Sequence, residues 1–205
     1  MNPCWIFGGA PINGKLLSEP PDDAYIIAAD SGYSAVMDMG LIPNLTVGDF
    51  DSLKDVKPSV GEVITAPAEK DDTDTMLAVR IALERGYRDI CIAGAIGGRL
   101  DHTFANIQTL AYIKSHGGFG RLVGENDTAE LIGEGTYTYK RADGMYLSLF
   151  SYGDSAVVTI RGAKYCVDGS RIENTFPLGV SNEITAEECS VIVSEGQILV
   201  VFSKK

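Results

Sequence analysis

Aspartates in the first half of the sequence are the residues best suited to chemistry. Asp49 and Asp51 are separated only by Phe50, so in an extended segment both carboxylates would face the same side. Two neighbouring carboxylates repel each other unless a cation lies between them. Mg²⁺ prefers oxygen ligands and is often held by a few carboxylates together with substrate phosphates. The pair therefore indicates a magnesium site; the alternative is a loop in which the aspartates only turn or cap the chain.

A second acidic run, Lys70-Asp71-Asp72-Thr73-Asp74, precedes a segment with helical periodicity. Capping a helix needs one side chain, and Asp72 or Thr73 can supply it. Asp71 and Asp74 are three residues apart and would share a face of the helix. The carboxylates beyond those needed for the cap indicate a metal or nucleotide site.

Gly97-Gly98-Arg99 is typical of a loop that approaches phosphate closely at the start of a helix. The guanidinium of Arg99 could hold phosphate oxygens in a two-pronged geometry. The alternative for the glycines is an ordinary turn between a strand and a helix. The alternative for Asp101 is a helix residue favoured by the positive end of the helix dipole. We expect His102 to pack or form hydrogen bonds rather than to catalyse.

The segments that must position these residues alternate between short apolar runs and longer helical patterns. The apolar runs are Cys4–Phe7, Tyr25–Ala29, Leu45–Val47, Glu62–Ala66, Asp89–Ala93 and Arg121–Gly124. The helical patterns are Ser31–Met39, Asp72–Arg85 and Leu100–Ser115, the last with Leu100, Phe104, Ile107 and Ala111 on one face. This alternation predicts an α/β domain with a mostly parallel sheet. The polar motifs follow the strands directly, at the edge where open parallel sheets bind ligands.

The second half has a different pattern of short β-rich stretches separated by Gly, Asp and Asn. They are Thr136–Tyr139, Tyr146–Phe150, Ala156–Arg161, Ser190–Val193 and Ile198–Phe202. This pattern predicts an all-β sandwich or small barrel, and we favour the sandwich. We therefore predict two domains, an α/β domain over residues 1–127 and an all-β domain over residues 128–205.

The composition narrows the possible partners and the compartment. The chain of 205 residues has 17 Lys and Arg against 28 Asp and Glu, a net charge of −11. Because nucleic acid attracts basic residues, this balance argues against DNA or RNA as a partner. The sequence shows neither the pattern of a secretory signal nor an apolar run that could span a membrane. Its four cysteines are scattered, which suits the reducing cytoplasm.

The motifs, taken in order along the chain, resemble those of the thiamine pyrophosphokinase family. They are Ala29-Asp30-Ser31-Gly32, Gly48-Asp49-Phe50-Asp51-Ser52, Lys70-Asp71-Asp72-Thr73-Asp74, Gly97-Gly98-Arg99-Leu100-Asp101-His102, Gly162-Ala163-Lys164-Tyr165 and Gly179-Val180-Ser181-Asn182-Glu183. The resemblance implies transfer of a pyrophosphoryl group from ATP to the hydroxyl of thiamine, leaving AMP. It also implies a homodimer whose sites lie between the α/β domain of one subunit and the β domain of the other.

The resemblance also implies roles for individual residues. The implied magnesium ligands are Asp49, Asp51 and Asp74, which with Arg99 form the implied catalytic set. The implied contacts to nucleotide or phosphate are Asp30, Ser31, Lys70, Asp71, Thr73, Arg99 and Asp101. The implied contacts to thiamine are Tyr165, Ser181 and Asn182.

Some alternatives stay open on the sequence alone. Some relatives carry tryptophan where this chain has Tyr165, and the alternative for Tyr165 is a half-buried aromatic residue of a strand. A magnesium-dependent hydrolase of nucleoside polyphosphates would use the same aspartates with water as the acceptor, and Tyr165 and Ser181-Asn182 argue against it. A non-catalytic nucleotide sensor would not need so many carboxylates.

Overall fold

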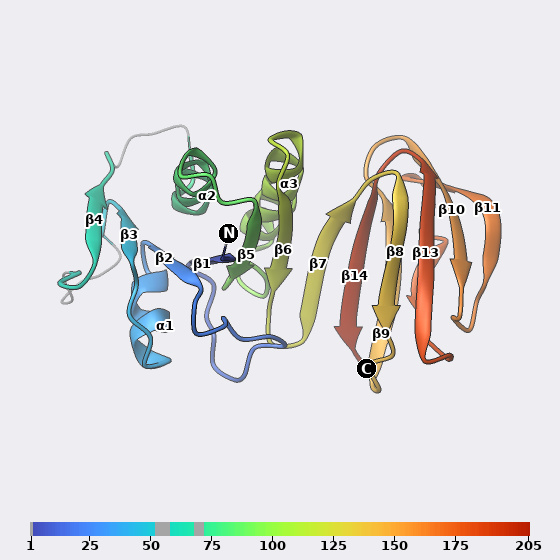
Figure 1. The fold of residues 1–205 in the computed structure, drawn as a ribbon, viewed down its shortest axis with the longest axis horizontal. Coiled ribbons are helices and arrows are strands. Elements are labelled where there is room, and N and C mark those ends of the chain that lie inside the picture. The colour runs from blue at the N-terminus through green and yellow to red at the C-terminus, as the bar shows by residue number, and fades with distance from the viewer. Residues whose placement is uncertain (1, 52–57, 68–71) are drawn as a thin grey trace. The chain divides into compact units, whose positions relative to one another are not determined.

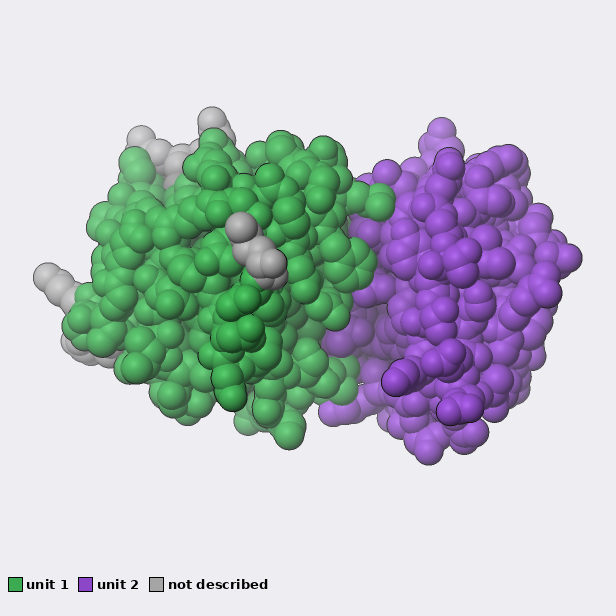
Figure 2. All heavy atoms as spheres, in the orientation of Figure 1, with its two compact units in different colours: residues 1–125 green, residues 126–205 purple. Residues whose placement is uncertain are grey.

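The computed structural model describes residues 2–51, 58–67 and 72–205 of the chain. The predicted nucleotide contacts Lys70 and Asp71 lie outside the described residues. The chain divides into two compact units, Met1–Glu125 and Asn126–Lys205 (Figure 2). We predicted the division after residue 127, and the structure places it after Glu125.

The first unit alternates strands and helices (Figure 1). Its strands are β1 (Cys4–Phe7), β2 (Tyr25–Ala29), β3 (Leu45–Gly48), β4 (Glu62–Thr65), β5 (Asp89–Ala93) and β6 (Phe119–Val123). Its helices are α1 (Gly32–Asp38), α2 (Asp74–Glu84) and α3 (Leu100–Ser115). The strands lie in the order β6-β5-β1-β2-β3-β4, and every pairing between these neighbours is parallel.

Helices cover both faces of this sheet because the central strands are buried on both sides. All four residues of β1 are buried. Alternate β1 residues, Trp5 and Phe7, pack with Tyr33 and Val36 of α1 in one apolar cluster. Helices α2 and α3 lie beside each other on the other face (Figure 1). This arrangement brings the amino-terminal ends of α2 and α3 to the carboxyl edge of the sheet.

Helix α2 begins where the sequence predicts a cap. The hydroxyl of Thr73 accepts a hydrogen bond from the backbone N–H of Met76 over 3.1 Å. Thr73 is therefore the capping residue of the two that we considered. Asp72 instead pairs with Arg80, whose Nη1 lies 2.6 Å from Oδ2 of Asp72.

The buried face of α3 differs from the prediction. Leu100 is 71% exposed and Phe104 is 61% exposed. The residues that α3 buries are Asn106, Thr109, Leu110 and Ile113. The close approach of α3 to β6 explains this choice, because a Cβ atom at Gly120 would lie 2.9 Å from Cδ1 of Ile113 and 3.0 Å from Cδ2 of Leu110. Apolar spacing in the sequence predicts which residues share a face of the helix. Which face packs against the sheet depends on the neighbouring residue, here the small Gly120 of β6.

The second unit consists of strands. They are β7 (Asp127–Ile132), β8 (Gly135–Lys140), β9 (Met145–Ser151), β10 (Ser155–Arg161), β11 (Val167–Glu173), β12 (Gly179–Asn182), β13 (Glu188–Glu195) and β14 (Ile198–Lys204). They form two layers, β12-β9-β14-β7 and β11-β10-β13-β8, with antiparallel pairing throughout.

The two layers of this unit face a common core. Burial alternates along β10 and β13, the period of a strand with one face inward. Leu147 and Val200 from one layer join Val158 and Val191 from the other in one apolar cluster. Packing of this kind between two antiparallel sheets is a β-sandwich.

The helices among the described residues do not reach the length and apolarity needed to cross a membrane.

Candidate active site

A cavity of about 380 Å³ lies in the first unit at the carboxyl ends of β1, β2 and β5. The first residues of α2 and α3 form its other walls. Five of the predicted nucleotide or metal residues line it together: Asp30, Ser31, Thr73, Asp74 and Arg99. They come from three motifs that are far apart in the sequence, so the fold assembles them. Backbone N–H groups at helix starts favour anions, so this cavity suits a phosphate chain.

Glycines let the backbone segments around the cavity approach one another. A Cβ atom at Gly9 would lie 2.6 Å from the hydroxyl oxygen of Ser31, and one at Gly8 would lie 2.9 Å from the carbonyl oxygen of Gly94. A Cβ atom at Gly32 would lie 1.9 Å from the carbonyl oxygen of Phe7. Side chains at these positions would therefore push apart the segments that form the cavity.

Asp30 directly follows the carboxyl end of β2 and has an unusual backbone conformation. Its φ angle is +48°, and its N–H donates to the carbonyl of Val47 over 2.8 Å. A Cβ atom at Gly48 would lie 3.1 Å from Cα of Asp30. The end of β3, which leads to Asp49, is therefore packed directly against a residue that lines the cavity.

The segment Asp49-Phe50-Asp51 is not extended, contrary to our expectation. Strand β3 ends at Gly48, and Phe50 has a φ angle of +63°. The N–H of Asp51 donates to Oδ1 of Asp49 over 3.1 Å, the hydrogen bond of an Asx turn. The turn that we considered as the alternative is present. It occupies one acceptor position of a carboxylate that offers about four.

The described residues include no group of three His, Cys, Asp or Glu arranged to hold a metal ion. The predicted ligands Asp49, Asp51 and Asp74 are thus not gathered as a set, and Asp71 lies outside the described residues. The donors present nevertheless fit Mg²⁺. This ion is often bound by one or two carboxylates and completes its shell with substrate phosphates and water, and Asp74 and Asp30 both line the phosphate-suited cavity.

Arg99 stands immediately before the first residue of α3 and turns its guanidinium onto Asp101. Nε and Nη2 of Arg99 lie 3.1 and 2.6 Å from Oδ1 and Oδ2 of Asp101. This pair lowers the pKa of Asp101 and raises the pKa of Arg99. Both side chains are exposed, so the pair is screened by water and easily exchanged. The same two donors match the geometry of a phosphate group.

Three residues with polar side chains line this cavity but lie outside the motifs: Thr75, Thr103 and Asn106. The side chain of Asn106 is buried, and its Nδ2 donates to the carbonyl of Ala95 over 2.9 Å. It thereby fixes the loop between β5 and α3. Helical spacing could have found two of these residues, because Thr103 and Asn106 lie four and seven positions after Arg99.

A second cavity, of about 360 Å³, lies in the second unit. Its walls are mainly apolar and include Ile160, Val167 and Ile172, with Tyr165 and Asn182 also lining it. Tyr165 is 60% exposed and precedes β11, so it is not the half-buried strand aromatic of the alternative prediction.

The structure brings Tyr165 and Asn182 together and places Ser181 differently. Ser181 is not among the residues that line the second cavity. Its φ angle is +60°, and its N–H donates to the hydroxyl of Ser148 over 3.0 Å. Asn182 is only 6% exposed and is hydrogen-bonded to the backbone of Tyr165.

Buried thiols play no part in either cavity. Burial raises the pKa of Cys4 and of Cys91 to about 12. Both remain protonated at neutral pH and are packed in strands β1 and β5, which are two of the predicted apolar runs.

An α/β unit with a cavity suited to phosphates, joined to a β-sandwich with an apolar cavity, is the arrangement expected of a two-domain enzyme that acts on a nucleotide and a second substrate. Comparison with known families agrees. The model of the thiamin pyrophosphokinase catalytic domain matches residues 20–118, and that of the thiamin pyrophosphokinase vitamin B1 binding domain matches residues 137–199. The chain belongs to the thiamine pyrophosphokinase family.

Individual relatives cover the whole chain. Thiamine pyrophosphokinase of Bacillus subtilis (strain 168) is 29% identical over 207 residues, which covers 97% of each chain. A crystal structure of thiamine pyrophosphokinase from Bacillus subtilis matches with a TM-score of 0.90 at 27% identity, covering 100% of both chains. A thiamin pyrophosphokinase family protein from Enterococcus faecalis matches with a TM-score of 0.86 at 30% identity, again over 100% of both chains. Neither the hydrolase nor the sensor is favoured by these relatives.

Proposed function

We propose that this chain carries out pyrophosphoryl transfer from ATP to the hydroxyl of thiamine with its two cavities as half-sites, ATP in the first unit and thiamine in the second. The enzyme belongs to a family of thiamine pyrophosphokinases, so its reaction type follows from membership. One observation supports the assignment of ATP to the first unit. At the starts of two helices, one cavity is lined by Asp30, Ser31, Thr73, Asp74 and Arg99.

The first unit would bind the phosphate chain of ATP through its backbone and Arg99. The starts of α2 and α3 present N–H groups with no partner inside the helix, and these donate well to anions. Gly9, Gly94 and Gly98 line the cavity, so backbone rather than side chains faces it at these positions. Arg99 would leave Asp101 and offset the negative charge that develops as AMP departs. Lys70 and Asp71 remain proposed contacts of the nucleotide.

The aspartates would hold Mg²⁺ against the phosphates. When bound, the ion supplies positive charge that neutralises the phosphate oxygens. Asp74 lines the cavity, and the turn at Asp49 and Asp51 follows the strand that packs against Asp30. We propose Asp49, Asp51 and Asp74 as the ligands, brought into one coordination shell only when the phosphates complete it.

The second unit would bind thiamine at Tyr165. Thiamine has a cationic thiazolium ring and a flat pyrimidine ring, and an aromatic face suits both. The apolar walls of the 360 Å³ cavity would receive the uncharged parts of the molecule. Ser181, whose backbone is strained within β12, supports this site by preceding Asn182 in the same strand.

We further propose a homodimer in which the α/β unit of one subunit meets the β unit of its partner. Leu100, which directly follows Arg99, and Phe104, five residues after it, are exposed beside the first cavity. Phe176, Leu178 and Val180 are exposed beside the second. Apolar surface at both half-sites would be covered if the two cavities faced each other across subunits.

Product analysis tests the reaction. With ATP and Mg²⁺, we expect AMP to form only when thiamine is present. AMP or ADP formed at the same rate without thiamine would show hydrolysis instead.

Asp49→Asn, Asp51→Asn and Asp74→Asn should each lower kcat by at least about 100-fold, the scale of one lost electrostatic contact in a transition state. Asp22→Asn, an exposed carboxylate remote from the motifs, is the matched control and should keep its rate.

Mixing two inactive variants tests the cross-subunit site. Co-refolding Asp51→Asn chains with Tyr165→Ala chains should restore partial activity, because one site of each mixed dimer combines two undamaged halves. Failure to regain activity, with mixed dimers demonstrated by mass, would place each site within a single chain. Recovery without mixed dimers would equally contradict the proposal.

A further inference from the structure

The side chain of Asn182 is already occupied by the protein. Its Oδ1 accepts hydrogen bonds from the N–H groups of Tyr165 and Glu183, both over 2.9 Å. Its Nδ2 donates to the carbonyl of Tyr165 over 2.8 Å. Both acceptor positions of the amide oxygen and one of the two amide hydrogens are therefore used. With 6% of its surface exposed, Asn182 has little left with which to bind a substrate.

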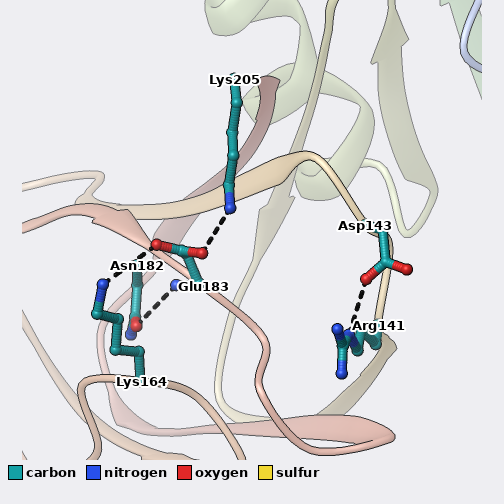
Figure 3. A network of polar contacts seen from close by, with 6 residues as sticks. All are labelled: Arg141, Asp143, Lys164, Asn182, Glu183 and Lys205. Atoms are coloured by element: carbon teal, nitrogen blue, oxygen red, sulfur yellow. Dashed lines mark hydrogen bonds and ion pairs between the residues drawn. The ribbon is translucent and has the colours of Figure 1, made fainter.

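The next residue, Glu183, also contacts the segment Lys164-Tyr165, through Lys164 (Figure 3). Its carbonyl accepts from the N–H of Lys164 over 2.8 Å. Its Oε1 lies 3.3 Å from Nζ of Lys164, and its other carboxylate oxygen lies 2.5 Å from Nζ of Lys205. The pair of ammonium groups lowers the pKa of Glu183, with Lys205 as the larger cause and Lys164 as the smaller.

Lys164 in turn lies over the ring of Tyr165, the residue proposed to bind thiamine. Its Nζ lies 5.7 Å from the centroid of the Tyr165 ring, within the range of a cation–π contact. Glu183 therefore restrains the Lys164 ammonium, and that ammonium restrains the ring. Asn182 restrains the backbone of Tyr165 from the other side. Tyr165 is 60% exposed and outside any strand, so the contacts with Asn182 and Lys164 help to hold it.

We propose that Asn182 and Glu183 form a clamp that positions Tyr165 at the mouth of the second cavity, and that neither residue contacts the substrate. This inference rests on the proposed role of Tyr165 and reassigns Asn182 from a substrate contact to a positioning residue. The clamp orders the aromatic surface before the ligand arrives. An ordered ring gives tighter binding because less side-chain entropy is lost on binding.

Variants of the clamp should change the KM for thiamine and should not change the KM for ATP. Asn182→Asp keeps the acceptor oxygen but replaces the donor to Tyr165 with a second acceptor. We expect it to raise the KM for thiamine about tenfold, the scale of one lost hydrogen bond. Glu183→Gln should raise the same KM about two- to fivefold, because exposed ion pairs are weak. The KM for ATP should stay unchanged in both. Arg141→Gln breaks the separate exposed pair with Asp143 drawn in Figure 3 and should change neither KM.

Two further measurements distinguish positioning from contact. Amide hydrogen exchange at Tyr165 and Glu183 should accelerate in Asn182→Asp, since both N–H groups lose their ordered acceptor. In a Tyr165→Ala background, Asn182→Asp should raise the KM for thiamine no further, because the clamp acts only through the ring. An additional tenfold increase in the double variant would show that Asn182 binds the substrate directly and would overturn the inference.

The outcome for Tyr165→Ala alone separates the clamp from the proposed function. If Tyr165→Ala raises the KM for thiamine while Asn182→Asp and Glu183→Gln do not, the clamp is wrong and the thiamine site stands. If Tyr165→Ala has no effect on this KM, the role proposed for Tyr165 is itself wrong, and the clamp falls with it. Should Asn182→Asp fail to fold, Glu183→Gln with the same double-variant comparison gives the decision.

Discussion

Replacing Gly32 with alanine should damage both the stability of the first unit and its binding of ATP. Gly32 is the first residue of α1 and directly follows Asp30 and Ser31, which line the first cavity. A Cβ atom there would lie 1.9 Å from the carbonyl oxygen of Phe7 and 2.6 Å from its carbonyl carbon. The obstacle is backbone of the central strand β1, which cannot rotate away as a side chain could.

The size of the effect follows from the distance. Ordinary contact begins at 3.4 Å, so α1 or β1 must move by about 3.4 − 1.9 = 1.5 Å. Overpacking of a core costs about 1–3 kcal/mol, and we expect the upper end because a backbone must shift. For a domain of the size of Met1–Glu125, about 3 kcal/mol lowers the Tm by about 12 °C. A misplacement of about 1 Å can cost about 100-fold in rate, so kcat/KM for ATP should fall by at least that factor.

The chain provides its own probe for this experiment. Trp5 is the only tryptophan, is buried in β1 and packs in the same cluster as Tyr33 of α1. Its fluorescence therefore reports unfolding of the first unit. Ser34→Ala, at an exposed position of the same helix, is the control and should leave both the Tm and the kinetics close to those of the unmodified protein. A Gly32→Ala protein with unchanged Tm and unchanged KM for ATP would refute the view that the close approach of α1 to β1 positions the cavity.

Three other changes have defined outcomes. Arg99→Lys keeps the charge but loses the two-pronged geometry, so kcat should fall by at least about 10-fold without a change in Tm; an unchanged kcat would mean that Arg99 is a surface residue. An aromatic disulfide reagent at about pH 8 should label Cys166, which is exposed, in the native protein. Cys4 and Cys91 should react only after unfolding, because burial raises the pKa of each to about 12; fast labelling of either in the folded state would contradict their packing. The lowered pKa of Glu183 contributes stability that is present above about pH 4.3, the ordinary value for a glutamate, and is lost as the pH falls through the lowered value. Glu183→Gln should therefore show a smaller drop in Tm than the unmodified protein between about pH 5 and about pH 3, and equal drops would show that the ion pairs do not contribute.

The sequence predicts best those elements whose residues are buried on both sides. The runs Cys4–Phe7, Tyr25–Ala29 and Asp89–Ala93 are strands with the predicted bounds, because central strands of a parallel sheet are continuously apolar. Strand β11 was not predicted from the sequence. It lies at the edge of its layer and only Ile172 is buried in it, so its sequence has no apolar run.

Site residues are predictable by type but less so by arrangement. The aspartates, Arg99 and Tyr165 attract notice because their chemistry is unusual for their surroundings. Asn106 does not, since a polar residue within a helix usually faces water, and only the fold shows that it is buried against the β5–α3 loop. The partner of the Arg99 guanidinium, two residues further on, depends on side-chain rotation that no spacing rule determines.

Three of the six motifs in the sequence contain a residue with a strained backbone. Among the described residues, three that are not glycine have positive φ angles: Asp30, Phe50 and Ser181. Each lies within a different predicted motif. Asparagine and aspartate tolerate this conformation, but a bulky residue such as phenylalanine adopts it rarely, and a strained residue costs about 1–3 kcal/mol. Such a cost persists where the surrounding structure fixes the turn, as the packing of Gly48 against Asp30 does in the first unit. Ser181 lies within β12, where the pairing with β9 is irregular, and it precedes Asn182, whose amide is hydrogen-bonded to the backbone of Tyr165. Strain at these three positions therefore helps to place the side chains that the proposed chemistry requires.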